Sequence, residues 1–210
     1  MSVDKLLQGY RRFRDGVFET HRPLAEDLVE HGQRPEVAIV ACVDSRVDPA
    51  LILQADPGDM LVIRNVANLV PPVDQEGTFH GTSAAIEFAV LGLGVKHLVV
   101  LGHAHCGGVA KMMAADQKDD TFTFLPTWVS QLSAAHRRVK ETLPDADAET
   151  QTRACEQNAV LVSLENLRTF PWVRSRVESG DLELHGWYID IGTGELSAYD
   201  GDTGEFAPID

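Results

Sequence analysis

Two short apolar runs of the sequence each end in residues that can bind a metal ion or move a proton. The run from Ala38 to Arg46 (AIVACVDSR) carries Cys42, and the run from His97 to Gly108 (HLVVLGHAHCGG) carries His103 and Cys106. Two thiolates and an imidazole suit zinc, which prefers tetrahedral coordination by nitrogen and sulfur. Three protein ligands leave a fourth position for water, as in catalytic rather than structural zinc sites. The residue types and spacing therefore predict a catalytic zinc ion.

A carboxylate and a guanidinium follow the first cysteine, because Asp44 and Arg46 stand two and four residues after Cys42. Asp44 could fill the fourth metal position itself, or it could accept a hydrogen bond from zinc-bound water. Arg46 would decide between these roles by holding Asp44 in a bidentate pair. The residues by themselves leave both roles of Asp44 open. Gly107 and Gly108, which follow Cys106, keep side chains away, so that a small substrate and backbone donors can approach the metal.

Each of these residues has a plain structural interpretation when it is taken alone. A cysteine at a strand end is often a small buried hydrophobe, and an Asp/Arg pair is often an ordinary surface pair. A histidine there is often a hydrogen-bonded loop residue. The conjunction of CxDxR after one apolar run and HxxCGG after another favours a functional site.

Buried strands must position these side chains. Runs rich in Val, Ile and Leu that are bounded by Gly and polar residues are typical of a parallel sheet. Open α/β sheets hold ligands at the carboxyl ends of such strands. If the first and second runs are neighbouring strands, Cys42, His103 and Cys106 converge on one point. Further strands are predicted at Met60 to Asn65 and at Leu182 to Ile191.

Helical spacing of apolar residues separates these strands. Helices are predicted at residues 3–18, 23–30, 48–54, 82–93, from 107 onward, 123–143, 154–167 and 172–177. Residues 70–81 are too rich in Pro and Gly for a regular element, residues 144–150 read as an exposed acidic connection, and the glycines after residue 191 suit a hairpin-like tail. The alternation of strands and helices predicts a mostly parallel α/β sheet.

Length and composition fit one domain, with a helical arm at residues 1–32 and an α/β zinc-binding core at residues 33–210. The net charge of −14 argues against nucleic acid or an anionic membrane as a partner. No stretch approaches the ~18 apolar residues of a membrane span, and the N-terminus lacks the apolar core of a signal peptide. We therefore expect a cytoplasmic protein whose three cysteines are thiols.

At these residues the sequence resembles the β-class carbonic anhydrases. The resemblance is carried by ACVDSRV, VIRNVANLVPP, AAIEFAVLGLGVKHLVVLGHAHCGG and CEQNAVLVSLENLRTFPWV, which cover most of residues 30–190. It implies reversible hydration of carbon dioxide to bicarbonate and a proton, by zinc-bound hydroxide that an Asp44/Arg46 dyad orients. It implies one zinc ion per subunit, on Cys42, His103 and Cys106.

The resemblance also implies a fold and an assembly. The fold is a mostly parallel α/β sheet with an added antiparallel strand and helices on both faces. The assembly is a homodimer or a higher homo-oligomer, in which N-terminal helices pack on the partner subunit. This packing would explain the apolar face of residues 6–18. The sequence does not distinguish a dimer from a tetramer or an octamer.

The resemblance to the family also extends to residues of the substrate pocket and of an anion-binding site. Gln33 stands nine residues before Cys42, where plant-type members carry a Gln that reaches the substrate site of the neighbouring subunit. The residues expected to bind substrate are Gln33, Leu61, Val66, Phe88 and Gly107. Ile39 replaces a Trp that some bacterial members place beside an inhibitory bicarbonate, although Arg64, which helps to bind that anion, is present. The resemblance therefore predicts no such bicarbonate switch. It predicts the open form, in which Asp44 pairs with Arg46 and would ligate the metal only in a closed state.

Two alternative functions stay open. One is a carbonyl sulfide or carbon disulfide hydrolase on the same scaffold, and the other is a non-catalytic zinc-binding homologue. His105 could shuttle protons or could be a polar residue at the rim of the site. Cys155 is expected to be packed and unreactive, since it lies in an apolar helical pattern.

Overall fold

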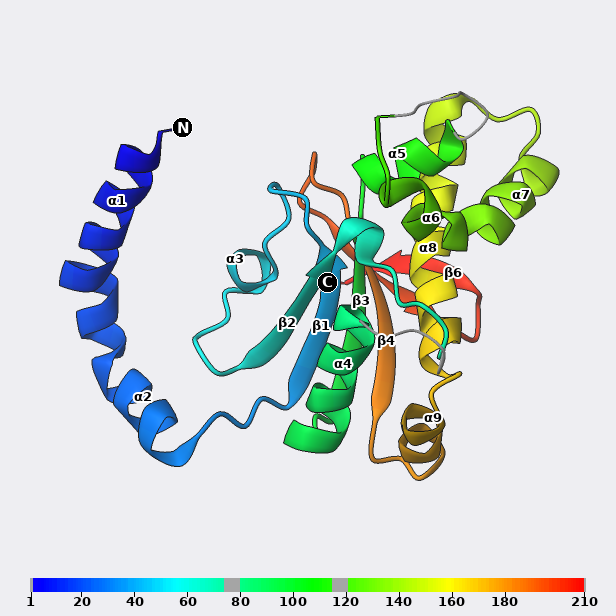
Figure 1. Cartoon of the computed structure of the whole chain (residues 1–210). Coiled ribbons are helices and arrows are strands. Elements are labelled where there is room, and N and C mark those ends of the chain that lie inside the picture. The colour runs from blue at the N-terminus through cyan, green and yellow to red at the C-terminus, as the bar shows by residue number, and fades with distance from the viewer. Residues whose placement is uncertain (1, 74–79, 115–120, 210) are drawn as a thin grey trace.

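Four parallel strands form the centre of the sheet in a computed structural model of the chain, which describes residues 2–73, 80–114 and 121–209 (Figure 1). The strand order is β2-β1-β3-β4-β5-β6. The strands are β1 (Val37–Cys42), β2 (Met60–Asn65), β3 (His97–His103), β4 (Glu183–Ile189), β5 (Leu196–Asp200) and β6 (Glu205–Pro208). The predicted parallel sheet is confirmed, and its antiparallel addition is a hairpin, because β5 runs antiparallel to β4 and β6 antiparallel to β5.

Nine α-helices accompany the sheet in the described part of the chain. They are α1 (Val3–Arg12), α2 (Phe18–His31), α3 (Pro49–Leu53), α4 (Gly81–Glu87), α5 (Gly107–Met113), α6 (Leu125–Val129), α7 (Ser133–Thr142), α8 (Ala148–Leu167) and α9 (Pro171–Glu178). None of the described helices has both the length and the apolar character that a bilayer span requires.

Both faces of the sheet are buried, as the continuous apolar character of β1 predicts. Ala38 and Val40 face α4, α8 and α9, while Ile39 and Ala41 face the side that α3 covers. All four side chains have no exposed surface. Successive residues of a strand point to opposite faces, so a strand with no polar position must be covered on both. The prediction of helices on both faces is confirmed.

The N-terminal helices extend away from the sheet as a long arm (Figure 1). The predicted helices at 3–18 and 23–30 are continuous, because wider π-type turns at Phe13–Val17 join α1 to α2 and Pro23 lies inside α2. Proline leaves the Glu19 carbonyl without its usual donor, and water can satisfy this carbonyl because the arm is exposed. No residue of either helix is buried in the chain by itself.

Other boundaries differ from the predicted ones in small ways. Helix α8 begins at Ala148 rather than 154, because the Asp147 side chain caps it and accepts a hydrogen bond from the Thr150 N–H at 2.7 Å. The predicted helix at 123–143 is divided by a tighter turn at Ser130–Leu132 into α6 and α7. Of the predicted irregular segment 70–81, residues 74–79 lie outside the described residues.

Candidate metal centre

The carboxyl ends of β1 and β3 meet where the topology of the sheet reverses. The two strands are neighbours, and the chain leaves β1 toward β2 on one side but leaves β3 toward β4 on the other. Open α/β sheets bind ligands in the crevice at such a switch point, because the connecting segments there diverge. Cys42 and His103 are the last residues of these strands, and Cys106 directly precedes α5.

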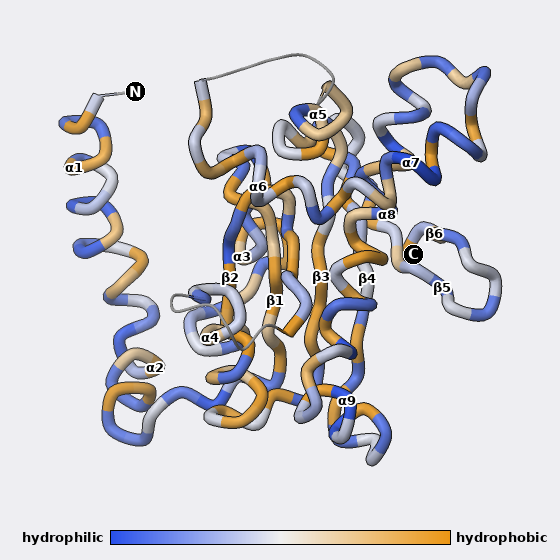
Figure 2. The backbone as a smooth tube through the Cα atoms, turned by 45° about the vertical axis from the view of Figure 1, so that its right-hand side comes forward, coloured by the Kyte–Doolittle hydropathy of each residue, from blue (hydrophilic) through white to orange (hydrophobic). Residues whose placement is uncertain are grey.

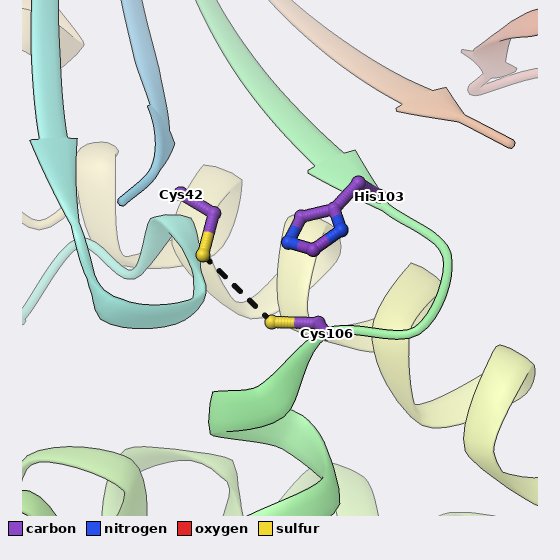
Figure 3. Close-up of side chains that lie close together, drawn as sticks. All are labelled: Cys42, His103 and Cys106. Atoms are coloured by element: carbon purple, nitrogen blue, oxygen red, sulfur yellow. Dashed lines mark hydrogen bonds between the residues drawn. The ribbon is translucent and has the colours of Figure 1, made fainter. Parts of the chain in front are cut away.

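The three predicted ligands converge there (Figure 3). Their ligand atoms all lie within 4.8 Å of one another, and the two sulfur atoms are 3.9 Å apart. Two sulfurs at ~2.3 Å from a tetrahedral zinc ion are separated by about 3.8 Å. The residues are buried, with 3% of Cys42 and 1% of His103 and of Cys106 exposed. The separation of the sulfurs therefore fits a zinc ion.

The His103 ring is oriented for coordination through one nitrogen. Its Nδ1 lies 2.8 Å from the Ala104 carbonyl and donates to it, which fixes the tautomer. Its Nε2 is buried and has no hydrogen-bond partner. A buried polar atom without a partner is costly, and a metal ion would supply the partner that this nitrogen lacks. The unpartnered Nε2 of His103 therefore supports a zinc site independently of the spacing between the two sulfurs.

The two thiols are coupled through the hydrogen bond between them. This bond to Cys106 lowers the pKa of Cys42, whereas the same bond, together with burial, raises the pKa of Cys106. The pair thus ionises to one thiolate readily and to two only with difficulty, since like charges 3.9 Å apart repel. A divalent cation between the sulfurs would remove this repulsion.

A strained turn holds Cys42 in place. The Ala67 N–H points at the Cys42 sulfur from 3.4 Å, and Ala67 and Asn68 have φ angles of 63° and 48°. Positive φ is unfavourable for residues other than glycine and is often retained at functional sites. A Cβ on Gly108 would lie 2.6 Å from Val66 Cγ1 and 3.0 Å from Ala67 Cβ, while one on Gly107 would meet nothing within 4 Å. The close approach thus requires Gly108 and not Gly107.

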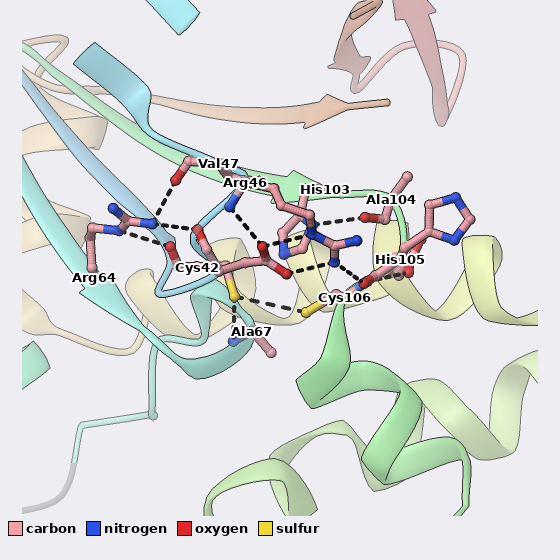
Figure 4. Close-up of polar contacts among 11 residues, drawn as sticks. Cys42, Arg46, Val47, Arg64, Ala67, His103, Ala104, His105 and Cys106 are labelled. Atoms are coloured by element: carbon pink, nitrogen blue, oxygen red, sulfur yellow. Dashed lines mark hydrogen bonds and ion pairs between the residues drawn. The ribbon is translucent and has the colours of Figure 1, made fainter. Parts of the chain in front are cut away.

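Asp44 and Arg46 form a bidentate pair beside the predicted metal ligands. Figure 4 shows the Arg46 side chain close to Cys42, His103 and Cys106. Arg46 Nε and one terminal nitrogen donate to the two carboxylate oxygens at 3.0 and 2.8 Å, and the Arg46 N–H adds a bond of 2.9 Å. These bonds from Arg46 hold the pKa of Asp44 well below its usual range, although partial burial opposes the shift. Arg46 also donates to the His105 carbonyl at 2.9 Å and so links the loops after β1 and β3.

Arg64 binds the backbone of the segment that follows β1. Its guanidinium donates to the carbonyls of Cys42, Asp44 and Val47 at 2.9, 2.7 and 2.6 Å (Figure 4). Three acceptors from one loop fix the path of the chain after Cys42. Arg64 therefore supports the position of Asp44.

Sequence reasoning missed a buried carboxylate behind Cys106. Glu156 on α8 is 3% exposed, accepts the Cys106 N–H at 2.8 Å and accepts the Tyr188 hydroxyl at 2.8 Å. Burial and the neighbouring Glu156 raise the pKa of Tyr188. The signal in the sequence is the helical spacing, because Glu156 stands three and four residues before Ala159 and Val160 and so shares an apolar helix face, where a charge needs partners.

The predicted substrate residues are divided between two hollows. Leu61 and Phe88 line a hollow of about 450 Å³, and Val66 lines one of about 820 Å³, with Gly81 and Thr82 bordering both. Gly107 is exposed at the start of α5. Within one chain, only Val66 and Gly107 of these predicted substrate residues lie near the predicted metal ligands.

Three other residues named in the sequence analysis, Gln33, His105 and Cys155, are not among the predicted metal ligands. Gln33 is exposed ahead of β1, at the end of that strand opposite Cys42. His105 is exposed and has a φ angle of 58°. Cys155 has no exposed surface, in keeping with a packed thiol.

Comparisons with known proteins agree on one family. A family model described as carbonic anhydrase matches residues 37–196. The carbonic anhydrase of Synechocystis sp. is 36% identical over 204 residues, 97% of this chain and 73% of that protein. Beta carbonic anhydrase 3 of Arabidopsis thaliana is 35% identical over 204 residues, 96% of this chain and 78% of that protein.

Solved structures give the same result. The β-carbonic anhydrase CcaA superimposes with a TM-score of 0.92 at 36% identity, over 99% of this chain and 92% of that one. One of two tetrameric β-carbonic anhydrases from Sordaria macrospora gives a TM-score of 0.81 at 31% identity, over 93% of this chain and 95% of that one.

Proposed function

Because the chain belongs to the β-class carbonic anhydrases, a family of enzymes, we propose that it hydrates carbon dioxide reversibly to bicarbonate and a proton at one zinc ion. Cys42, His103 and Cys106 would hold that ion. The observation that carries the proposal is the buried, unpartnered Nε2 of His103 beside two thiols 3.9 Å apart. Family and fold support the reaction, and this donor set supports the metal.

The charged pair beside the ligands would orient the reacting water. When bound, zinc supplies the Lewis acidity that makes water a nucleophile near neutral pH. Arg46 keeps Asp44 ionised and fixes the plane of its carboxylate through two parallel bonds. An ionised, fixed carboxylate can accept a hydrogen bond from water and hold its oxygen toward the substrate. Asp44 would become a metal ligand only if this pair opened.

Stopped-flow hydration of carbon dioxide by the zinc-loaded protein tests the proposal. We expect turnover that rises with pH, and we expect Asp44→Asn to reduce it about 100-fold or more while zinc stays bound. Asp48→Asn is the matched control, because Asp48 lies in the same loop and caps α3, a role that Asn fills equally well. Its ion pair with Arg64 is long, at 3.9 Å, and partly exposed, so its loss should matter little. Undiminished turnover in Asp44→Asn would remove Asp44 from the mechanism.

The same assay separates the two alternative functions. Fast hydrolysis of carbonyl sulfide with slow hydration of carbon dioxide would assign the sulfur substrate instead. No turnover of either gas by protein with stoichiometric zinc would assign a non-catalytic role.

We further propose that the arm formed by residues 1–32 packs on a second copy of the chain. The apolar side chains of the arm are left exposed, among them Leu6 at 60%, Tyr10 at 57% and Val17 at 53%. Contiguous apolar surface of this kind usually marks an interface. Figure 2 shows apolar residues recurring along this isolated arm. A homo-oligomer, as in the tetrameric relatives from Sordaria macrospora, would cover it.

In such an assembly Gln33 would reach the partner's substrate pocket, with Leu61, Val66, Phe88 and Gly107 as its other lining residues. Sedimentation velocity tests the assembly, and we expect Leu6→Glu to shift the protein toward the monomer. Gln33→Ala should then lower turnover without changing the sedimentation coefficient. An unchanged rate in Gln33→Ala would remove Gln33 from the pocket.

A further inference from the structure

Two histidines and a glutamate form a second cluster of ligand atoms, at the end of the sheet opposite the cysteines. His97 begins β3, and Glu183 and His185 lie at the start of β4 (Figure 1). Their ligand atoms lie within 4.8 Å of one another. The cluster takes no part in the proposed reaction, because Cys42 and His103 lie at the carboxyl ends of their strands.

We propose that His97, Glu183 and His185 form a second binding site for a divalent transition metal of the zinc type. The two ring nitrogens, Nδ1 of His97 and Nε2 of His185, are 3.2 Å apart, and each is 3.7 Å from a Glu183 oxygen. Ligands at ~2.0–2.2 Å from a tetrahedral zinc ion are about 3.3–3.5 Å apart. The three observed separations are within a few tenths of an ångström of that geometry.

Strand register holds the three side chains on one face. His97 is directly opposite Glu183 in the parallel pair, and His185 is two residues further along β4. Residues i and i+2 of a strand share a face, and neighbouring strands are ~4.8 Å apart, so all three side chains must project together. The Glu183 N–H donates to the Lys96 carbonyl at 2.8 Å, which anchors the start of β4. Ligands on strands are placed more rigidly than ligands on loops.

The surroundings favour a cation that water can reach. The side chains of His97, His185 and Glu183 are 38%, 32% and 65% exposed, so an ion can enter and keep a water as its fourth ligand. The nearby Lys96 ammonium is paired with Glu36 at 2.5 Å, so its charge is compensated. Two imidazoles and a carboxylate are a common ligand set for zinc.

A metal at this site would join β3 to β4 and stabilise the folded chain, since the unfolded chain lacks the register that assembles the ligands. Equilibrium dialysis against Zn²⁺, starting from protein with one zinc at the cysteines, tests this. We expect a second equivalent per chain and a Tm that rises with Zn²⁺ concentration. His185→Gln should keep the first equivalent and weaken the second about 100-fold or more, because even residues behind the ligands matter by 10–100-fold.

Two further variants and a cobalt spectrum make the test specific. Glu183→Gln should weaken the second equivalent as well, and its exposed side chain makes this variant a check should His185→Gln fail to fold. His31→Gln is the matched control, because His31 contacts Asp27 at 3.0 Å on the exposed arm and should retain both equivalents. Co²⁺ added to the zinc-loaded protein should give visible d–d absorption without thiolate-to-cobalt charge transfer.

Three results would overturn the proposal. They are a single equivalent in the unmodified protein, a second equivalent that survives in both variants, and thiolate bands from the second Co²⁺. Hydration of carbon dioxide should be unchanged in His185→Gln and Glu183→Gln, which keeps this proposal separable from the proposed function.

Discussion

Replacing Gly108 by Ala should destabilise the contact between the start of α5 and the turn that holds Cys42. The added methyl would lie 2.6 Å from Val66 Cγ1 and 3.0 Å from Ala67 Cβ. Val66 is stiff at χ1, and Ala67 cannot shift easily because it is already at a φ of 63°. Overpacking of this kind costs about 1–3 kcal/mol. The helix would therefore move away from the turn and take Cys106 with it.

Gly107→Ala is the matched control, since a methyl group there meets nothing within 4 Å. Both substitutions gain up to ~1 kcal/mol from replacing Gly by Ala in a helix, so their difference isolates the steric term. We expect Gly108→Ala to unfold at a Tm about 2–12 °C below that of Gly107→Ala. Thermal and urea unfolding measure this, and a chelator competition assay should show weaker zinc retention in Gly108→Ala only. Equal stability of the two variants would refute the close approach.

Three other expectations concern charge and reactivity. Because Arg46 depresses the pKa of Asp44, the pair stabilises the folded protein above about pH 4, and this stability is lost as the pH falls further. The urea midpoint of Arg46→Ala should therefore depend less on pH, between about 5 and 2, than the midpoint of the unmodified protein. Burial raises the pKa of Cys155 to about 11, whereas the hydrogen bond from Cys106 lowers the pKa of Cys42. A thiol reagent at neutral pH should therefore modify Cys42 first in chelator-treated native protein and reach Cys155 only after unfolding. Early modification of Cys155 would contradict its packing. In Glu156→Gln a single acceptor oxygen faces two donors, the Cys106 N–H and the Tyr188 hydroxyl, so one of the two hydrogen bonds is lost or reversed. We expect zinc affinity to fall about 10–100-fold in a chelator titration. Unaltered affinity would rule out a supporting role for Glu156.

Particular elements show how far the sequence alone could go. The strands β1 and β3 and their terminal residues Cys42 and His103 were predictable, because buried parallel strands have a continuous apolar pattern that polar residues end abruptly. The start of α8 was predicted six residues late, although Asp147 is a typical capping residue and could have indicated it. The division between α6 and α7 has no comparable signal, since Ser130–Leu132 remains helical and only its turns tighten.

The contacts behind the metal ligands needed the folded chain. Glu156 could be suspected of a buried role, but its partners Cys106 and Tyr188 come from other elements. Arg64 was aligned with an anion-binding residue, whereas its three carbonyl acceptors follow from the pairing of β2 with β1.

By itself, the sequence determined the parallel α/β class and the chemistry of the predicted metal ligands, because residue types and local periodicity express both directly. Only the tertiary structure decided which distant side chains meet. The convergence of Cys42 with His103, and of His97 with Glu183 and His185, depends on strand order and register. Register is set by how whole faces of the sheet pack, and a shift of one residue would turn each of these side chains to the opposite face.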